Sequence, residues 1–304
     1  ISLGLVGSEM CIRDRPLAGP STTSNFPWFS GFINDFRSDL VMTTRHNYPL
    51  AAMSKNPSDA RFATIENLLS ASTASDWKKL MAQHQRASAA AGLPFRVTEA
   101  GSASSGGKPG VSDVFASALW CADYLFDLAE LGVAGVNFHG SFNCRGYTSF
   151  CALKHGGYHA HANYYGMLFF GQATPGRIIP VTTLGEGVNL TSHAVVGKDG
   201  FLRVALINKD LKNGAKVALK LANRSNQATI MRLNAPSAEA KAGITLGGSG
   251  VSSDGTWKPK SVESVDSVNG EFEVQIPAVS AALLVVGSTK PIPATGEQVP
   301  YDAK

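Results

Sequence analysis

The sequence predicts an α/β fold followed by an all-β domain. Strand-like and helix-like segments alternate over residues 16–171, whereas short strands separated by turns occupy residues 172–287. A β-α-β-α-β order implies a parallel sheet with right-handed crossovers, and a succession of strands and turns implies an antiparallel β-sandwich. Polar residues also follow successive strands of the first part, which is typical of a site at the carboxyl ends of parallel strands.

The composition excludes several classes of protein. The 304 residues are 44% hydrophobic and 16% charged, with a formal net charge of +4, which is ordinary for a globular protein of one or two domains. No apolar run approaches the roughly 18 residues of a membrane span. We therefore expect no membrane span. The basic residues are dispersed and lack interleaved aromatic residues, so we also expect no nucleic-acid partner.

Both ends of the chain differ from the rest. Residues 1–15 resemble the translation of a sequencing-library adapter, so we exclude them from the fold and expect the natural protein to begin upstream of Pro16. Residues 288–304 contain three prolines and few apolar residues, and we expect a flexible tail.

The first part contains three predicted strands and two predicted helices. We expect the first of these helices to begin at Ser75 and Asp76, and the second to be capped by Ser112 and to stop at Gly132. Apolar residues at helical spacing support both helices. The expected strands are residues 39–44, the segment that carries Glu99, and residues 133–140.

Glu99 is the first candidate for chemistry. It is a lone carboxylate at the end of a short buried strand, where it must be solvated, paired or used. The plain alternative is a strand-end residue that faces water or pairs with Arg96. Repetition favours a site, because polar side chains also follow the other two strands: His46 and Tyr48 after the first, and Asn137 and His139 in the last.

The second part is predicted to be an antiparallel β-sandwich with no obvious catalytic cluster. Four segments of alternating polarity read as strands, and Asp-Gly or Asn-Gly dipeptides at residues 199–200, 213–214, 254–255 and 269–270 supply the turn signals. The four segments are residues 201–208, 216–221, 228–233 and 272–276.

The cysteines point to a loop rather than a metal site. Cys144 and Cys151 could close a short loop in an oxidising compartment, whereas Cys121 lies in an apolar helical pattern and is expected to be buried. No Cys-x-x-Cys pair is present. His155, His159 and His161 suggest a metal site, but no cysteine or spaced acid completes a ligand set, so we expect a histidine-containing loop and no metal.

Several motifs together resemble glycoside hydrolase family 79, the retaining β-glucuronidases that include the heparanases. The resemblance covers nearly all of residues 16–287. Its motifs are residues 45–48 (Arg-His-Asn-Tyr), residues 98–102 (Thr-Glu-Ala-Gly-Ser), the glycine-rich residues 106–113, residues 115–120, residues 135–140, Tyr147, residues 164–168, residues 243–251 and residues 276–283.

The resemblance implies the C-terminal half of a (β/α)8 TIM barrel, about strands 5–8, followed by a β-sandwich. It also implies that Glu99 is the nucleophile, that His46 and Tyr48 bind it or the sugar, and that His139 and Tyr147 line the sugar subsite. Such an enzyme needs no cofactor and uses two carboxyl groups. The family's acid/base glutamate follows an asparagine on the fourth barrel strand, and no Asn-Glu precedes Pro16, so we expect this chain to be inactive alone. We also expect a secreted or periplasmic protein.

The loop after Glu99 departs from the family's pattern at the position that meets the sugar. Where the family places a tyrosine near the uronate carboxylate, this sequence has Ser104 and Ser105. The backbone N–H groups of Ser105, Gly106 and Gly107 could still cradle an anion. A glucuronide is therefore the expected substrate, and a neutral or methylated sugar stays open. The alternative from another class is a carbohydrate-binding protein without catalysis.

Overall fold

The structure is a computed structural model that describes residues 16–23, 25–140, 144–185, 187–221 and 224–288. Residues 1–15 and 289–304, which include the suspected adapter segment and nearly all of the expected flexible tail, lie outside the described residues.

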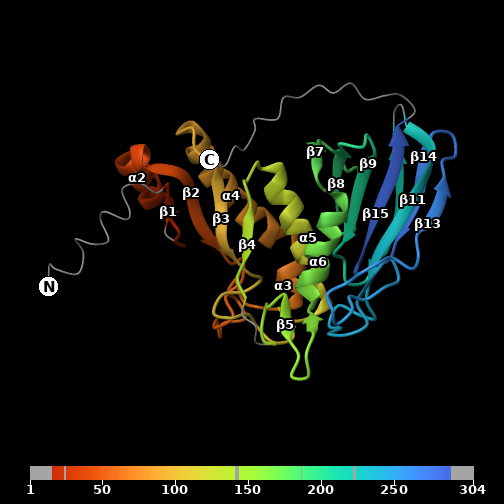
Figure 1. Cartoon of the computed structure of the whole chain (residues 1–304), viewed down its shortest axis with the longest axis horizontal. Helices are drawn as coiled ribbons and strands as arrows, with labels where there is room; N and C mark the ends of the chain where they lie inside the picture. Colours follow the sequence, from red (N-terminus) through yellow and green to blue (C-terminus); the bar gives the residue numbers. More distant parts are fainter. Residues whose placement is uncertain (1–15, 24, 141–143, 186, 222–223, 289–304) are drawn as a thin grey trace.

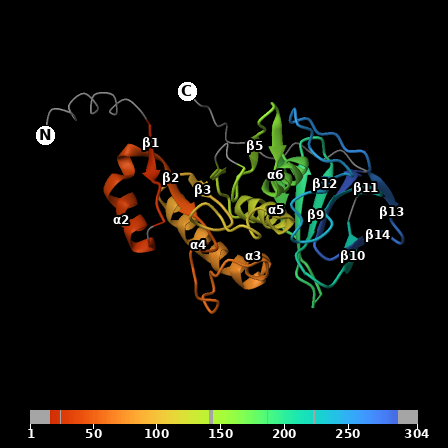
Figure 2. The same ribbon diagram turned by 90° about the horizontal axis from the view of Figure 1, so that it is seen from below.

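The first part is a parallel sheet with the order β1-β2-β3-β4. Every neighbouring pair in it is parallel, as the alternation of strands and helices predicts. Helices connect the strands and gather on one side of the sheet, as Figure 2 shows for α2 and α4. The elements are β1 (Leu17–Pro20), α2 (Phe26–Phe36), η1 (Arg37–Asp39), β2 (Leu40–Asn47), α3 (Ile65–Leu69), α4 (Ala71–Ala90), β3 (Phe95–Ala100), α5 (Phe115–Glu130) and β4 (Val136–Phe138).

The sequence analysis missed β1 and α2. The strand β1 has only four residues, too few for an alternating pattern. The helix α2 contains Pro27 in its first turn, where proline is tolerated because its missing N–H would have no partner inside the helix. The Asn25 side chain caps this helix by accepting a hydrogen bond from the Trp28 N–H at 3.1 Å.

The predicted helix starts were wrong for both helices. Helix α4 begins at Ala71, because the hydroxyl of Ser70 accepts a hydrogen bond from the Thr73 N–H at 3.1 Å. Helix α5 begins at Phe115 and has no side-chain cap. Its first two N–H groups, of Phe115 and Ala116, instead donate to the carbonyls of Ala240 and Ala238 at 2.8 and 2.9 Å. The cap of α5 thus comes from a loop of the second part, more than 120 residues away.

Helix α5 is the centre of the molecule. In Figure 1 it lies with α6 (Ala162–Ala173) between the parallel sheet and the β-strands of the second part. Most of its apolar residues are buried, and the polar residues Asp123 and Asp127 are buried as well. Phe126 packs against Phe169 of α6 and stacks on His193 of the second part, with ring centroids 6.5 and 4.9 Å apart. Gly132, with φ +76°, follows its last turn as predicted.

The second part contains a seven-stranded antiparallel sheet and a smaller layer formed by β10 and β14. The four predicted strands are present as β9, β10, β11 and β14. An apolar core that includes Leu206, Ile230 and Phe272 lies between the two layers. The strands are β7 (Gly176–Ile179), β8 (Leu190–Gly197), β9 (Leu202–Asn208), β10 (Ala215–Lys220), β11 (Arg224–Asn234), β12 (Thr245–Leu246), β13 (Glu263–Asp266), β14 (Glu271–Ile276) and β15 (Ser280–Ser288).

A small hairpin of β5 (Phe150–Ala152) and β6 (Tyr158–Ala160) extends beside the loops that follow β2 and β3 (Figure 1). It contacts the second part, since the Tyr158 N–H donates to the Ser253 carbonyl at 2.7 Å. Within the described residues, no helix combines the length and the apolar character that crossing a bilayer requires.

Candidate active site

An irregularity in β3 places Glu99 at the edge of the parallel sheet. Arg45 of β2 pairs with Val97, but the next residue, His46, pairs with Glu99, so Thr98 is an extra residue in β3. Val97 and Ala100 are both fully buried although they are three residues apart. The extra residue therefore changes the alternation and turns Glu99 away from the buried face, next to His46.

Three side chains surround the Glu99 carboxylate. The hydroxyl of Tyr48 donates a hydrogen bond to Oε1, the Nδ1 atom of His46 lies 3.5 Å from Oε2, and the Nδ1 atom of His139 lies 3.8 Å from Oε1. About one third of the Glu99 side chain is exposed, so a ligand can reach it. The alternative partner, Arg96, donates instead to the side chain of Asn137 at 2.8 Å. The Asn137 side chain thus accepts a hydrogen bond from Arg96, and the contacts of Glu99 are with Tyr48, His46 and His139.

The Tyr48 phenol is kept in its protonated form. Its burial, and then its hydrogen bond to Glu99, raise the pKa of Tyr48 far above the usual value near 10. The phenol is therefore protonated at neutral pH and acts as a hydrogen-bond donor there. A donor fixed on a carboxylate stabilises the charged form that a nucleophile requires.

A second tyrosine completes the group. The hydroxyl of Tyr147 lies 2.7 Å from Nδ1 of His139, which is in turn 3.3 Å from the Tyr48 hydroxyl. The rings of Tyr48 and Tyr147 have centroids 5.9 Å apart. The structure thus brings together five residues that were predicted to share a site: His46, Tyr48, Glu99, His139 and Tyr147.

In the glycine-rich loop after β3, Gly107 shapes the turn, whereas the sequence analysis expected its N–H to bind an anion. Ser105, Gly106 and Gly107 all have positive φ, which allows a tight turn. The Gly107 N–H donates to the Ser104 carbonyl at 3.3 Å, so it is satisfied inside the turn and departs from the expected anion cradle. A Cβ at Gly107 would lie 2.9 Å from the Tyr147 nitrogen, and one at Gly146 would lie 1.7 Å from the Gly106 carbonyl oxygen. The glycines therefore let the Tyr147 segment lie directly on this loop.

Buried polar residues hold the end of β2, and the sequence analysis did not identify them. The Asn47 side chain donates to the Tyr124 hydroxyl of α5 at 3.0 Å. Arg45 donates to the His46 carbonyl at 3.0 Å and contacts the ring of His84 on α4. Burial, and then the neighbouring Arg45, lower the pKa of His84 to about 4, so its ring is neutral. A signal was present, since Arg45 and Asn47 alternate with His46 in the predicted strand end.

A cavity of about 510 Å³ opens beside His46 and Tyr48, between the end of β2 and the first turns of α4. Arg45, Arg61 and Trp77 also line it, whereas Glu99 does not. Arg61 donates to the Tyr48 carbonyl at 2.9 Å and thereby fixes the turn that follows β2.

Two groups of side chains in the described residues have the spacing of metal ligands, and both are occupied by other bonds. Cys144 and Cys151 lie beside His161, but the two sulfur atoms form a disulfide. His159 lies next to His161, with ring centroids 4.9 Å apart, and His155 is exposed. Cys121 is free and buried, as predicted.

The second group is an ionic cluster between α5 and the β-strands, defined here as Asp123, Asp127, Glu130, His193, Lys209 and Lys78. His193 donates to Asp123 at 2.9 Å and to Glu130 at 2.6 Å, and Lys209 forms an ion pair with Asp123. Lys78 pairs with Asp127 at 2.6 Å. Lysine ammonium groups fill the places that a cation would take, so this cluster joins the two parts of the chain. The sequence contained a signal for this cluster, since Asp123 and Asp127 lie four residues apart in an otherwise apolar helix.

Comparison with known proteins gives a family match in the second part. Residues 192–283 match the family described as glycosyl hydrolase family 79 C-terminal beta domain. This segment resembles a family 79 beta domain. The match confirms the predicted resemblance for the second part, which includes β8 to β14. A search of curated protein sequences gave no significant match.

Solved structures of several glycoside hydrolases have a fold similar to that of this chain. A 4-O-α-L-rhamnosyl-β-D-glucuronidase from Fusarium oxysporum 12S superposes with a TM-score of 0.72 at 22% identity, over 88% of this chain and 58% of that one. The GH51 α-L-arabinofuranosidase from Thermotoga petrophila has a TM-score of 0.68 at 13% identity, over 91% of this chain and 59% of its own. The GH51 arabinofuranosidase from Xanthomonas axonopodis pv. citri gives 0.63 at 15%, over 88% and 57%.

These superpositions confirm the predicted fold class. The parallel sheet corresponds to part of a TIM barrel, and the family 79 beta domain follows it. The chain spans less than three fifths of the length of each of these structures. Over the part that it spans, its fold is similar to theirs.

Proposed function

We propose that this chain carries the nucleophile half of a retaining glycoside hydrolase of the β-glucuronidase type, with Glu99 as the nucleophile. The observation that supports this most directly is the hydrogen bond from the half-buried Tyr48 phenol to Glu99, at the carboxyl end of a parallel strand. Substrate sites of TIM-barrel enzymes lie at that end. The family 79 beta domain supports the same assignment.

In the proposed reaction, Glu99 attacks the anomeric carbon of the sugar and displaces the aglycone. Tyr48 holds Oε1, which leaves Oε2, 3.5 Å from His46, as the attacking oxygen. The bond from carbon to the leaving oxygen breaks as the bond to Oε2 forms, and a glycosyl ester results. His139 and Tyr147 would line the sugar subsite beside Glu99.

Retaining hydrolysis needs a second carboxyl group about 5 Å from the first, which protonates the leaving oxygen and later activates water. In the described residues, the groups that contact Glu99 are a tyrosine and two histidines. We therefore expect this chain to hydrolyse an aryl glucuronide only when a second polypeptide supplies that carboxyl group.

The proposed substrate is a glucuronide, and the proposed location is secreted or periplasmic. The likeness to a rhamnosyl-glucuronidase supports a uronate, and the Cys144–Cys151 disulfide supports an oxidising compartment. The amides of Ser105 and Gly106 would meet the uronate carboxylate, while Gly107 shapes their loop.

A fluorosugar tests whether Glu99 is the nucleophile, because its reaction does not need the second carboxyl group to protonate the leaving group. Fluoride leaves from 2-deoxy-2-fluoro-β-D-glucuronyl fluoride without protonation, and the fluorine at C2 slows hydrolysis of the glycosyl ester. We expect intact-protein mass spectrometry to show one added glycosyl group, and peptide mapping to place it on Glu99. Glu99→Gln should form no adduct, and Glu66→Gln, which removes an exposed carboxylate of α3, should react like the original chain.

The same reagents separate the other possibilities. A faster adduct with the corresponding glucosyl fluoride would indicate a neutral sugar. Glucuronate that binds by calorimetry equally well to the original chain and to Glu99→Ala, with no adduct from either fluoride, would contradict the enzyme assignment and favour a carbohydrate-binding protein.

A further inference from the structure

The disulfide between Cys144 and Cys151 closes the loop that carries Tyr147. Tyr147 and Thr148 in this loop are only 5% and 4% exposed, although the loop lies at the surface. Tyr147 contacts His139 at 2.7 Å, and Gly146 lies on the Gly106 carbonyl. The loop leads directly into β5, which contains Cys151. The disulfide therefore ties the start of the loop to β5.

The two sulfur atoms differ in their access to solvent. Cys144 is exposed, whereas Cys151 is fully buried in β5, opposite His159 of β6. An external thiolate therefore reaches the sulfur of Cys144, and Cys151 becomes the leaving group. The rate of such an exchange increases when the leaving thiolate is stabilised.

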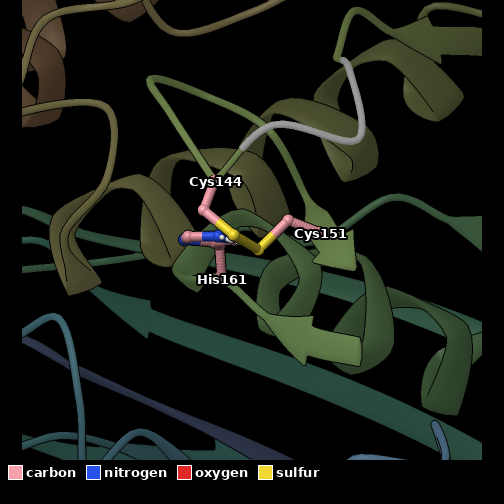
Figure 3. A group of neighbouring side chains, drawn as sticks. All are labelled: Cys144, Cys151 and His161. Carbon is pink, nitrogen blue, oxygen red and sulfur yellow. Dashed lines mark hydrogen bonds between the residues drawn. A yellow bond between two sulfur atoms is a disulfide. The ribbon is translucent and has the colours of Figure 1, made fainter. Parts of the chain in front are cut away.

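His161 is placed to stabilise that thiolate. Its Nε2 atom lies 3.3 Å from the Cys151 sulfur, and Figure 3 shows its ring beside the disulfide. A disulfide sulfur carries no hydrogen, so the Nε2–H of His161 is the donor. The backbone of His161 is held because its N–H donates to the Ser149 carbonyl at 2.9 Å and because the residue lies directly before the first turn of α6. The N-terminus of this twelve-residue helix also favours a negative charge.

We propose that Cys144–Cys151 is a thiol-sensitive positioning pair, opened at Cys144 with His161 stabilising the departing Cys151 thiolate, and that its opening releases Tyr147 from the sugar site. One thiolate of a dithiol bonds to the Cys144 sulfur, the Cys144–Cys151 bond breaks, and its electron pair stays on Cys151. The second thiol of the reductant then releases Cys144, so the protein gains two thiols and the dithiol is oxidised to a disulfide. The consequence for sugar binding rests on the proposed function, but the exchange reaction does not.

The exchange is tested by the rate of reduction with dithiothreitol at fixed pH, followed by alkylation and mass spectrometry. A hydrogen bond to a charged group is worth about one factor of ten in rate or more, so His161→Ala should reduce on the order of tenfold more slowly. His155→Ala, which changes an exposed histidine nearby, should leave the rate unchanged. A brief reaction with a monothiol should give a mixed disulfide on Cys144. Equal rates in the two variants, or a mixed disulfide on Cys151, would overturn the proposal.

Release of Tyr147 is tested by hydrogen exchange and by the fluorosugar. Reduction, or the double variant Cys144→Ser and Cys151→Ser, should raise amide exchange over residues 145–149 at least tenfold and slow adduct formation on Glu99 by a similar factor. Cys121→Ser, which removes the buried free thiol, should change neither. Unchanged exchange after reduction would refute the positioning role. If no adduct forms in either redox state, the proposed function fails, while exchange and reduction rates still decide this inference.

Discussion

Gly101 lies against Tyr147 so closely that a Cβ at Gly101 would be 2.8 Å from the Tyr147 ring. The same Cβ would be 2.9 Å from the ring of Tyr48. Glycine at this position, two residues after Glu99, thus allows both tyrosines to converge on the carboxylate. The site therefore requires glycine at position 101, because any side chain there would collide with the two rings.

We expect Gly101→Ala to disturb the site more than the fold. Forcing a methyl group into this contact should destabilise the protein by about 1–3 kcal/mol and displace one of the two rings. Urea unfolding and the rate of the fluorosugar reaction measure the two effects. Gly31→Ala on α2 is the control, because a Cβ there meets no atom within 4 Å. A Gly101→Ala chain that reacts at the original rate would show that the tyrosines need not approach this closely.

Tyr48→Phe should weaken the nucleophile while leaving the sheet intact. Loss of the hydrogen bond to the Glu99 carboxylate is expected to slow adduct formation about 10- to 100-fold, since hydrogen bonds to charged groups contribute about 1.5–3 kcal/mol. The control is Tyr158→Phe in the β5–β6 hairpin, where the ring is half exposed. An undiminished rate in Tyr48→Phe would assign the phenol a structural role only.

The ionic cluster predicts a loss of stability at alkaline pH. Burial alone would lower the pKa of His193, but hydrogen bonds to Asp123 and Glu130 outweigh it and raise this pKa to about 9. The folded chain therefore holds a proton that the unfolded chain, with a pKa near 6.5, releases earlier. The stabilisation is fully present below about pH 6.5 and is lost as the pH rises to about 9. Burial and Asp123 raise the pKa of Asp127 to about 6, so that group titrates below this range.

We expect the free energy of unfolding to decrease by up to about 3 kcal/mol between pH 6.5 and 9. Urea titrations across this range measure the decrease. In His193→Gln the decrease should largely disappear, because the glutamine does not titrate. His155→Gln should retain it. A flat profile in the original chain would contradict the assignment of a protonated His193.

The pair of Lys209 and Asp123 predicts a large effect of one substitution. Lys209 is 4% exposed, and Lys209→Met would leave a buried carboxylate with one fewer cation. The expected loss of stability is about 3–5 kcal/mol. Lys216→Met, which breaks an exposed ion pair with Glu273, should cost no more than about 1 kcal/mol. Similar small losses in both variants would mean that water reaches the buried pair.

The sequence by itself determined where the strands of the site lie and which carboxylate ends one of them. These properties are local: a short apolar run bounded by a turn and a glycine-rich loop favours a strand, and the carboxylate of Glu99 at its end is visible in the sequence itself. The same holds for Gly132 after α5 and for the turn signals of the second part, because backbone conformation at a turn depends on the residues of that turn.

Only the tertiary structure decided what those residues contact. The start of α5 is set by carbonyls of Ala238 and Ala240, which no local cap signal reveals. The register that puts His46 beside Glu99 depends on one extra residue in β3, and the buried charges of α5 depend on Lys209 and His193 far along the chain. Contacts of this kind form between segments that are distant in sequence, and their energies arise only when both segments are packed together.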